Sequence, residues 1–338
     1  MPKILIVAPN WIGDALLAQP LFARLRKKTP GAVIDALAPP WTAPVLRRMP
    51  EINEVMAAPF AHGELKLAAR WRLGRSLRSR RYDEAIVLPN TLKSALIPFF
   101  AGIPLRTGFV GELRYGLLNL VHKLDAKRTP LMAERYAQLA EKPGTKPALP
   151  LPETKLAIDE TNLIIALGRL GLSRAKPIAA FCPGAEYGSS KRWPVMHFAA
   201  LARRLVALGC AVWLFGSEKD RAIGEEIAVA SEGAATNLCG RTDLASAIDL
   251  LSLAEVVVSN DSGLMHVAAG VGRPVVALYG SSSPEHTPPR ARTFRIVRTG
   301  IYCSPCFARD CPLGHFKCMN DLAPERVMAE IAAVRGSA

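Results

Sequence analysis

The chain has 338 residues, of which 50% are hydrophobic and 21% charged, and its formal net charge is +14. This size and composition suit two globular domains with buried cores. The sequence contains no run of about 18 uncharged apolar residues, which excludes an evident membrane-spanning helix. Its first residues, Met1 to Ala8, are typical of a β-strand rather than a secretory leader. We therefore expect a globular, cytoplasmic protein.

Short apolar runs alternate with helical segments along the first half of the chain. Strands are expected at 3–8, 33–38 and 84–88, and helices at 15–28 and 44–48. Strands separated by helices predict a parallel sheet covered by helices. A first domain is therefore expected over residues 1–155.

The alternation restarts at Pro177, after a proline-rich stretch at 142–152 that suits a linker. A helix at 158–170 precedes the second sheet, and the second domain is expected over 156–322. The last helix, 324–334 in the segment 323–338, is a candidate to pack back across the domain junction. The strands expected in the second domain are 178–182, 211–215, 254–258 and 275–279, and its helices are 194–208 and 220–230.

These patterns predict an α/β protein with two Rossmann-like domains that face one another across a cleft. Ligands of such folds bind at the carboxyl ends of the strands, so the cleft is the expected site. Neither half contains the glycine-rich Gly-x-Gly-x-x-Gly or the P-loop motif. Dehydrogenase and P-loop phosphotransferase functions therefore lose their usual sequence support.

Positive charge is concentrated in the first half, where residues 1–155 hold 24 Lys and Arg against 12 Asp and Glu. The segment from Lys66 to Arg81 contains seven basic residues and no acidic one. Such a surface attracts nucleic acid, anionic lipid headgroups or a phosphorylated substrate, although it is also compatible with a solvated helix face. No nucleic-acid recognition motif accompanies the charge, so nucleic acid is not the expected partner.

Four of the seven cysteines form a cluster, with His315 inside it. A structural zinc ion is chemically reasonable for four close thiols in a reducing compartment, but the usual paired Cys-x2-Cys knuckles are missing. Reduced thiols in a tight loop are the alternative, and we expect no metal and no catalytic role here. The cluster consists of Cys303, Cys306, Cys311 and Cys318.

One stretch, Val258 to His266, joins an apolar strand to a small-residue turn and then to the start of an apolar helix. Backbone N–H groups and the positive end of a helix dipole converge in this arrangement, which favours an anion such as a diphosphate. An ordinary strand-to-helix turn has the same appearance when it stands alone.

Three further loops carry candidate side chains. Asp14 follows the first strand, where it could serve as a general base or simply cap a helix. Lys191 follows the strand 178–182 and could meet a phosphate, with Gly184 and Gly188 allowing close backbone approach. Glu218 follows the next strand, where it could bind ribose hydroxyls or carry a helix-terminal charge.

The chain resembles the ADP-heptose:lipopolysaccharide heptosyltransferases of glycosyltransferase family 9 along nearly its whole length. The resemblance is carried by several strings in order, which makes it specific. They are APNWIGD at 8–14, VLPNTLKSAL at 87–96, FFAGIP at 99–104, RYGLLN at 114–119, CPGAEYG at 182–188, KRWP at 191–194 and NDSGLMHVAA at 260–269.

The resemblance implies a fold of the glycosyltransferase B type and metal-independent, inverting transfer of heptose from ADP-heptose without a cofactor. It implies that Asp14 is the catalytic base. Donor binding is implied for Lys191, Glu218, Asp261, Ser262, Gly263, Leu264 and His266. The acceptor, a phosphorylated lipopolysaccharide inner core, is expected on the first domain near Lys93, Arg106 and Arg114.

The strings at 89–95 and 114–119 resemble the members that transfer to the first heptose of the inner core. A member acting on the heptose-free Kdo-lipid A acceptor, another B-type glycosyltransferase and a sugar-nucleotide epimerase remain alternatives, as does a basic nucleic-acid-binding protein. Because the acceptor is a membrane glycolipid, the resemblance also implies peripheral association with the anionic cytoplasmic face of the inner membrane.

Overall fold

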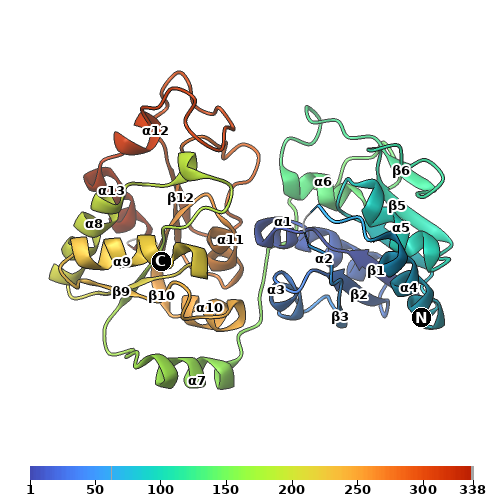
Figure 1. Ribbon diagram of the computed structural model, residues 1–338, viewed down its shortest axis with the longest axis horizontal. Helices are drawn as coiled ribbons and strands as arrows, with labels where there is room; N and C mark the ends of the chain where they lie inside the picture. The colour runs from blue at the N-terminus through green and yellow to red at the C-terminus, as the bar shows by residue number, and fades with distance from the viewer. Residues whose placement is uncertain (62, 336–338) are drawn as a thin grey trace. The chain divides into compact units, whose positions relative to one another are not determined.

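The computed structural model describes residues 1–61 and 63–335. It divides into two compact units, with unit 1 spanning Met1–Thr154 and unit 2 starting at Lys155 (Figure 1). Each unit contains a six-stranded sheet in which all strand pairs are parallel. The predicted α/β class, with two Rossmann-like halves, is confirmed.

The sheet of unit 1 has the strand order β3-β2-β1-β4-β5-β6. Its order reverses between β1 and β4, which creates the topological switch point where ligands of open α/β sheets bind. The strands are β1 (Lys3–Val7), β2 (Val33–Ala38), β3 (Glu54–Ala57), β4 (Glu84–Val87), β5 (Leu105–Phe109) and β6 (Leu120–His122).

Helices connect these strands and cover the sheet, with α2 contacting α6 and α4 contacting α5. The helix expected at 15–28 is wrong in two respects, because it begins at Ile12 and is interrupted at Ala18. Pro20 explains the interruption, since proline is tolerated in the first turn of a helix and not in its interior. The helices are α1 (Ile12–Leu17), α2 (Gln19–Lys28), α3 (Ala43–Arg47), α4 (Leu67–Leu77), α5 (Leu92–Phe100) and α6 (Met132–Gln138).

The sheet of unit 2 has the order β12-β11-β10-β7-β8-β9 and reverses between β10 and β7. Its strands are β7 (Ile178–Cys182), β8 (Ala211–Leu214), β9 (Ala235–Asn237), β10 (Ala254–Asn260), β11 (Val275–Leu278) and β12 (Phe294–Val297). Its helices are α7 (Glu160–Leu170), α8 (Val195–Ala207), α9 (Arg221–Ala230), α10 (Leu244–Leu251), α11 (Gly263–Gly270), α12 (Lys317–Asn320) and α13 (Pro324–Arg335).

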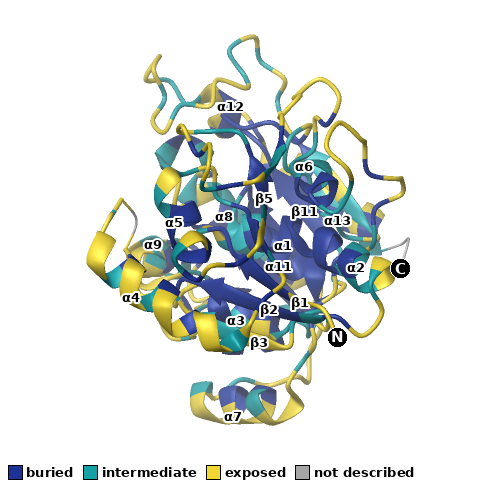
Figure 2. Cartoon of the chain, turned by 90° about the vertical axis from the view of Figure 1, so that its right-hand side faces the viewer, coloured by how far each residue is buried: buried dark blue, intermediate teal, exposed yellow. Residues whose placement is uncertain are grey.

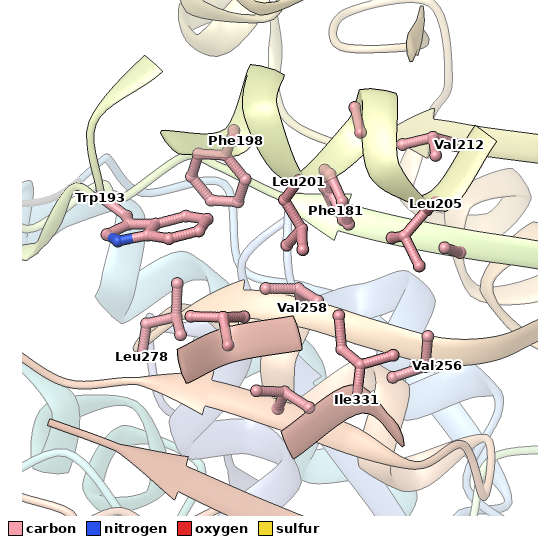
Figure 3. Packing of buried hydrophobic residues seen from close by; sticks show 14 of the residues in the cluster. Phe181, Trp193, Phe198, Leu201, Leu205, Val212, Val256, Val258, Leu278 and Ile331 are labelled. Atoms are coloured by element: carbon pink, nitrogen blue, oxygen red, sulfur yellow. The ribbon is translucent and has the colours of Figure 1, made fainter. Parts of the chain in front are cut away.

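The core of unit 2 lies between β-strands and the helices α8 and α13 (Figure 3). Trp193 packs edge-on against Phe198, and its indole N–H donates to the Leu322 carbonyl at 2.8 Å. The buried tryptophan therefore joins the loop after β7 to the segment before α13. This contact keeps its polar atom satisfied, as burial requires.

Helix α13 contacts α8, β10, β11 and β12, all of which belong to unit 2. Packing across the domain junction stays a prediction. Among the described residues, no helix combines the length and apolarity needed to cross a membrane. Figure 2 shows the sheet strands as the most buried elements, whereas much of α4 is exposed.

Candidate functional site

In unit 1, a cavity of about 220 Å³ opens at the switch point of the sheet. The loop after β1 contributes Asn10 and the loop after β4 contributes Asn90, and Asp14 and Tyr136 also line the space. Polar side chains thus gather where the strand order reverses, as the topology predicts.

Asp14 lies inside α1, as the third residue of the helix, rather than in the preceding loop as expected. The N-cap residue is Trp11, which makes no side-chain capping hydrogen bond. Asp14 is thus not the N-cap. A carboxylate in this first turn is stabilised by the positive end of the helix dipole.

Tyr136 of α6 is a neighbour of Asp14 that the sequence did not reveal. Burial raises the pKa of its hydroxyl well above the usual value, and the Asp14 charge raises it further. The phenol therefore remains protonated beside the carboxylate at physiological pH. In the sequence, Tyr136 stands in the segment 132–138, for which no helix was predicted, so nothing in the sequence placed it beside Asp14.

Two of the expected acceptor-binding arginines are bonded to backbone. Arg114 is 2% exposed, and its guanidinium donates to the carbonyls of Pro89 and Phe109 and to the Asn90 side chain. Arg106 donates to the carbonyl of Leu117 at 2.6 Å. Arg114 therefore braces the loop after β4, which lines the cavity. Their contact with an acceptor stays a prediction.

Lys93, the third expected acceptor residue, is half-buried and lines a smaller cavity at the same end of the sheet. Arg70 lines it as well, with its guanidinium 4.0 Å from the centre of the Phe60 ring. Asn10 and Pro89 line both cavities. The two spaces therefore adjoin the same pair of loops.

In unit 2, the loops after β7 and β10 meet at the second switch point. The Lys191 ammonium lies 2.6 Å from a carboxylate oxygen of Asp261. Asn260 ties the loops together, because its side chain accepts from Trp193 N–H and donates to the Pro183 carbonyl at 2.7 Å. Lys191 and Asp261, which the sequence placed in separate motifs, thus form one ion pair.

Helix α11 starts at this point, with Ser262 as its N-cap and Gly263 and Leu264 in its first turn. The Ser262 hydroxyl contacts the Ser259 hydroxyl and makes no capping bond. The first backbone N–H groups of α11 are therefore not capped by Ser262, and the helix dipole favours an anion there.

His266, on the same helix, is buried. Desolvation lowers its pKa to about 4, opposed by the Asp261 charge and assisted by Lys191 and Arg290. The imidazole is consequently neutral at pH 7, so it can donate one hydrogen bond and accept another without adding charge. Together, Lys191, Asp261 and His266 form a compact electrostatic group.

Glu218 lies just past β8 and pairs with Arg221 at 2.7 Å. It is exposed, and within the described residues it shows no contact with Lys191 or Asp261. The structure therefore places Glu218 at the carboxyl end of β8 but not within the charged group. Its contact with ribose stays a prediction.

The glycines and serines of the loop after β7 contact other parts of unit 2, and close approach of a ligand to Gly184 and Gly188 stays a prediction. A side chain on Gly184 would lie about 2.5 Å from the Asp220 carboxylate, and one on Gly188 would overlap the Arg309 carbonyl. Ser189 donates to Asp310 at 2.6 Å. The sequence could not separate space needed for a ligand from space filled by a distant loop.

All seven cysteines are free thiols. Cys311 accepts a hydrogen bond from Phe316 N–H at 3.4 Å, and such backbone donors lower the pKa of its thiol. Within residues 1–61 and 63–335, no three His, Cys, Asp or Glu side chains form a group able to hold a metal ion. The choice between a structural zinc ion and reduced thiols for this cluster stays a prediction.

Two doubly wound units, each with polar groups at its switch point, form an α/β fold of the glycosyltransferase B type. The sequence profile of glycosyltransferase family 9 (heptosyltransferase) matches residues 70–317. The chain belongs to this family.

Similar proteins cover most or nearly all of the chain. It is 46% identical to lipopolysaccharide heptosyltransferase 2 of Escherichia coli K12, over 98% of both chains. It is 44% identical to lipooligosaccharide heptosyltransferase 2 of Haemophilus influenzae, over 88% of each. The solved structure of E. coli ADP-heptose lps heptosyltransferase II matches with a TM-score of 0.89 and 43% identity, covering 99% of both chains.

Proposed function

We propose that this enzyme is a heptosyltransferase II, which transfers L-glycero-D-manno-heptose from ADP-heptose to the first heptose of the lipopolysaccharide inner core. The observation that carries the proposal is the Lys191–Asp261 pair at the start of α11. It supplies a cation and helix N–H groups for a diphosphate in a chain 46% identical to a protein named lipopolysaccharide heptosyltransferase 2.

Unit 2 is the proposed donor domain. Lys191 and the start of α11 would hold the diphosphate, while the carboxylate of Asp261 and the neutral imidazole of His266 suit sugar hydroxyls. Glu218 is the proposed ribose contact. To make it, the carboxylate would have to reorient from Arg221, which an exposed pair permits at small cost.

Unit 1 is the proposed acceptor domain, with Asp14 as the base. The acceptor oxygen forms a bond to the anomeric carbon from the face opposite ADP, and the bond to the diphosphate oxygen breaks, which inverts the configuration. The hydroxyl proton passes to Asp14, and the released electron pair leaves on ADP. No covalent intermediate or metal ion is needed.

Lys93 is the cation that we propose to meet an acceptor phosphate, because it lines a cavity next to the Asp14 space. Arg114 would act indirectly, by fixing the backbone of Pro89. Arg106 holds the Leu117 carbonyl in the same way. The three expected acceptor residues therefore have different proposed tasks.

Because this acceptor is a glycolipid, we propose peripheral binding to the cytoplasmic face of the inner membrane through the outer face of α4. Trp71 and Leu67 are 49% and 51% exposed, although both are large and apolar. Arg72 and Arg75 lie exposed on the same helix, with Arg75 over the Trp71 ring. Exposed aromatic and basic residues together suit the interface of an anionic bilayer.

The enzymatic proposal is tested by ADP release from ADP-heptose with lipid acceptors that carry no heptose or one heptose. Turnover with only the mono-heptosylated acceptor is expected. Turnover with only the heptose-free acceptor would instead identify a heptosyltransferase I. ADP release without any acceptor would indicate hydrolysis of the donor, and conversion of ADP-heptose without ADP release would indicate epimerisation.

The membrane proposal is tested by co-sedimentation with vesicles of phosphatidylethanolamine, with and without phosphatidylglycerol. Binding should need the anionic lipid and should weaken as the salt concentration rises. The variants Trp71→Ala and Arg72→Ala/Arg75→Ala should each bind the vesicles more weakly, because each cation contributes about 1 kcal/mol of binding free energy. Matched controls are Tyr302→Ala and Arg174→Ala/Lys176→Ala, which remove exposed residues of unit 2. Equal losses in the controls would contradict the assignment to α4.

A further inference from the structure

The segment from Phe307 to Asp310, which lies between Cys306 and Cys311, is bonded to the loop after β7. The Tyr187 hydroxyl donates to the Phe307 carbonyl at 2.7 Å, and Ser190 N–H donates to the Arg309 carbonyl at 3.0 Å. The Ser190 hydroxyl also donates to the Ala308 carbonyl. With the Ser189–Asp310 bond, every residue of this segment contacts the loop that carries Lys191.

The same segment is fixed to the loop after β11. Phe307 N–H donates to the Ser281 carbonyl at 2.7 Å, and the hydroxyls of Ser281 and Ser190 lie 2.8 Å apart. The Arg309 carbonyl also fills the space beside Gly188, where any side chain would collide with it. The segment is therefore a built part of the proposed donor site rather than an independent surface loop.

The side chain of Arg309 shares an aromatic ring with Lys191. The Arg309 guanidinium carbon lies 5.3 Å from the centre of the Tyr187 ring, and the Lys191 ammonium lies 5.1 Å from it. Lys191 is paired with Asp261, whereas the exposed Arg309 makes no ion pair with the described carboxylates. Arg309, a cation without an ion-pair partner among the described residues, thus flanks the same ring as Lys191, which is paired with Asp261.

We propose that Arg309 is a second diphosphate-binding residue and that the Phe307–Asp310 segment forms one wall of the nucleotide-sugar site. This inference rests on the proposed donor site around Lys191. A guanidinium can bind two phosphate oxygens at once, and the Arg309 charge remains available because no carboxylate of residues 1–61 and 63–335 neutralises it. It also favours the leaving group, whose negative charge increases as the sugar departs.

Calorimetric titration of the full-length enzyme with ADP and with adenosine tests the contact. The Arg309→Ala variant should bind ADP about tenfold more weakly and bind adenosine unchanged, because adenosine lacks the diphosphate. Arg309→Lys should bind ADP with intermediate affinity, since lysine keeps the charge without the bidentate geometry. Arg326→Ala, which removes an exposed arginine from α13 of the same unit, is the matched control and should match the wild type.

The outcomes separate this inference from the donor site itself. If the wild-type enzyme does not bind ADP, the proposed donor site and the proposed Arg309 contact are both overturned. ADP binding that is equal in the wild type and Arg309→Ala overturns the inference alone. Equal weakening of ADP and adenosine also overturns it, because that result reports a displaced wall rather than a lost charge contact.

Discussion

Lys191 and Asp261 come from loops 70 residues apart, and their side chains form a 2.6 Å ion pair at the switch point of unit 2. The Asp261 side chain is only 7% exposed, so its carboxylate depends on the lysine for compensation. We therefore expect the ion pair to stabilise the folded enzyme and to contribute to the proposed diphosphate site. Variants of the two residues can separate these roles.

Lys191→Met should destabilise the enzyme by about 3 kcal/mol, because it leaves a buried charge without its partner. It should also weaken ADP binding. The double variant Lys191→Met/Asp261→Asn should recover much of the stability in urea denaturation, while ADP affinity measured by calorimetry stays low. Recovery of both properties would show that Lys191 acts only as the partner of Asp261.

Asp14→Asn should lower kcat by about 10³-fold, since the amide cannot accept the acceptor proton. Lys191→Ala should cost about 100-fold, the usual loss for one stabilising group at a leaving charge. ADP affinity should be unchanged in Asp14→Asn, because Asp14 belongs to unit 1. Steady-state rates measured with saturating acceptor give kcat for each variant. Equal residual activities of the two variants would contradict the assigned roles.

The sequence predicted both sheets because buried parallel strands are near-continuous apolar runs, as in Val256 to Val258. It also placed Lys191 and Asp261 at strand ends, where parallel topology brings them together. It could not predict that Arg114 bonds backbone carbonyls or that Arg309 adjoins Gly188. Those relationships depend on tertiary contacts between distant segments, for which charge and local pattern carry no signal.

Gly74→Ala should destabilise unit 1 by roughly 1–3 kcal/mol. An added Cβ would lie 2.6 Å from the Phe100 Cβ and 2.8 Å from the Ile97 carbonyl, so α4 would have to move away from α5. Gly168→Ala in α7 is the matched control, because nothing lies within 4 Å of its added Cβ. The Gly168→Ala variant should be more stable than the wild type by about 0.5–1 kcal/mol, because alanine has a higher helix propensity than glycine. Urea denaturation of both variants measures the difference, and losses of equal size would contradict close packing at Gly74.

His266 should make the enzyme less stable in mild acid. Its pKa is about 4 in the folded protein and about 6.5 in an unfolded chain, so the unfolded state binds more protons between these values. The free energy of unfolding therefore falls as the pH drops through this window and is insensitive to His266 above it. From pH 7 to pH 5 the residue should account for a loss of about 2 kcal/mol.

The His266→Gln variant should lack this component while keeping a polar side chain at the buried position. Urea denaturation at pH 7 and pH 5 gives the loss for each protein, and the wild type should lose about 2 kcal/mol more than the variant. Burial also lowers the pKa of His122, but His122 is present in both proteins. Its contribution therefore cancels when the stability losses of the wild type and the variant are compared. An equal loss in both proteins would mean that His266 is protonated as readily in the folded state as in the unfolded chain, which its burial beside Lys191 opposes.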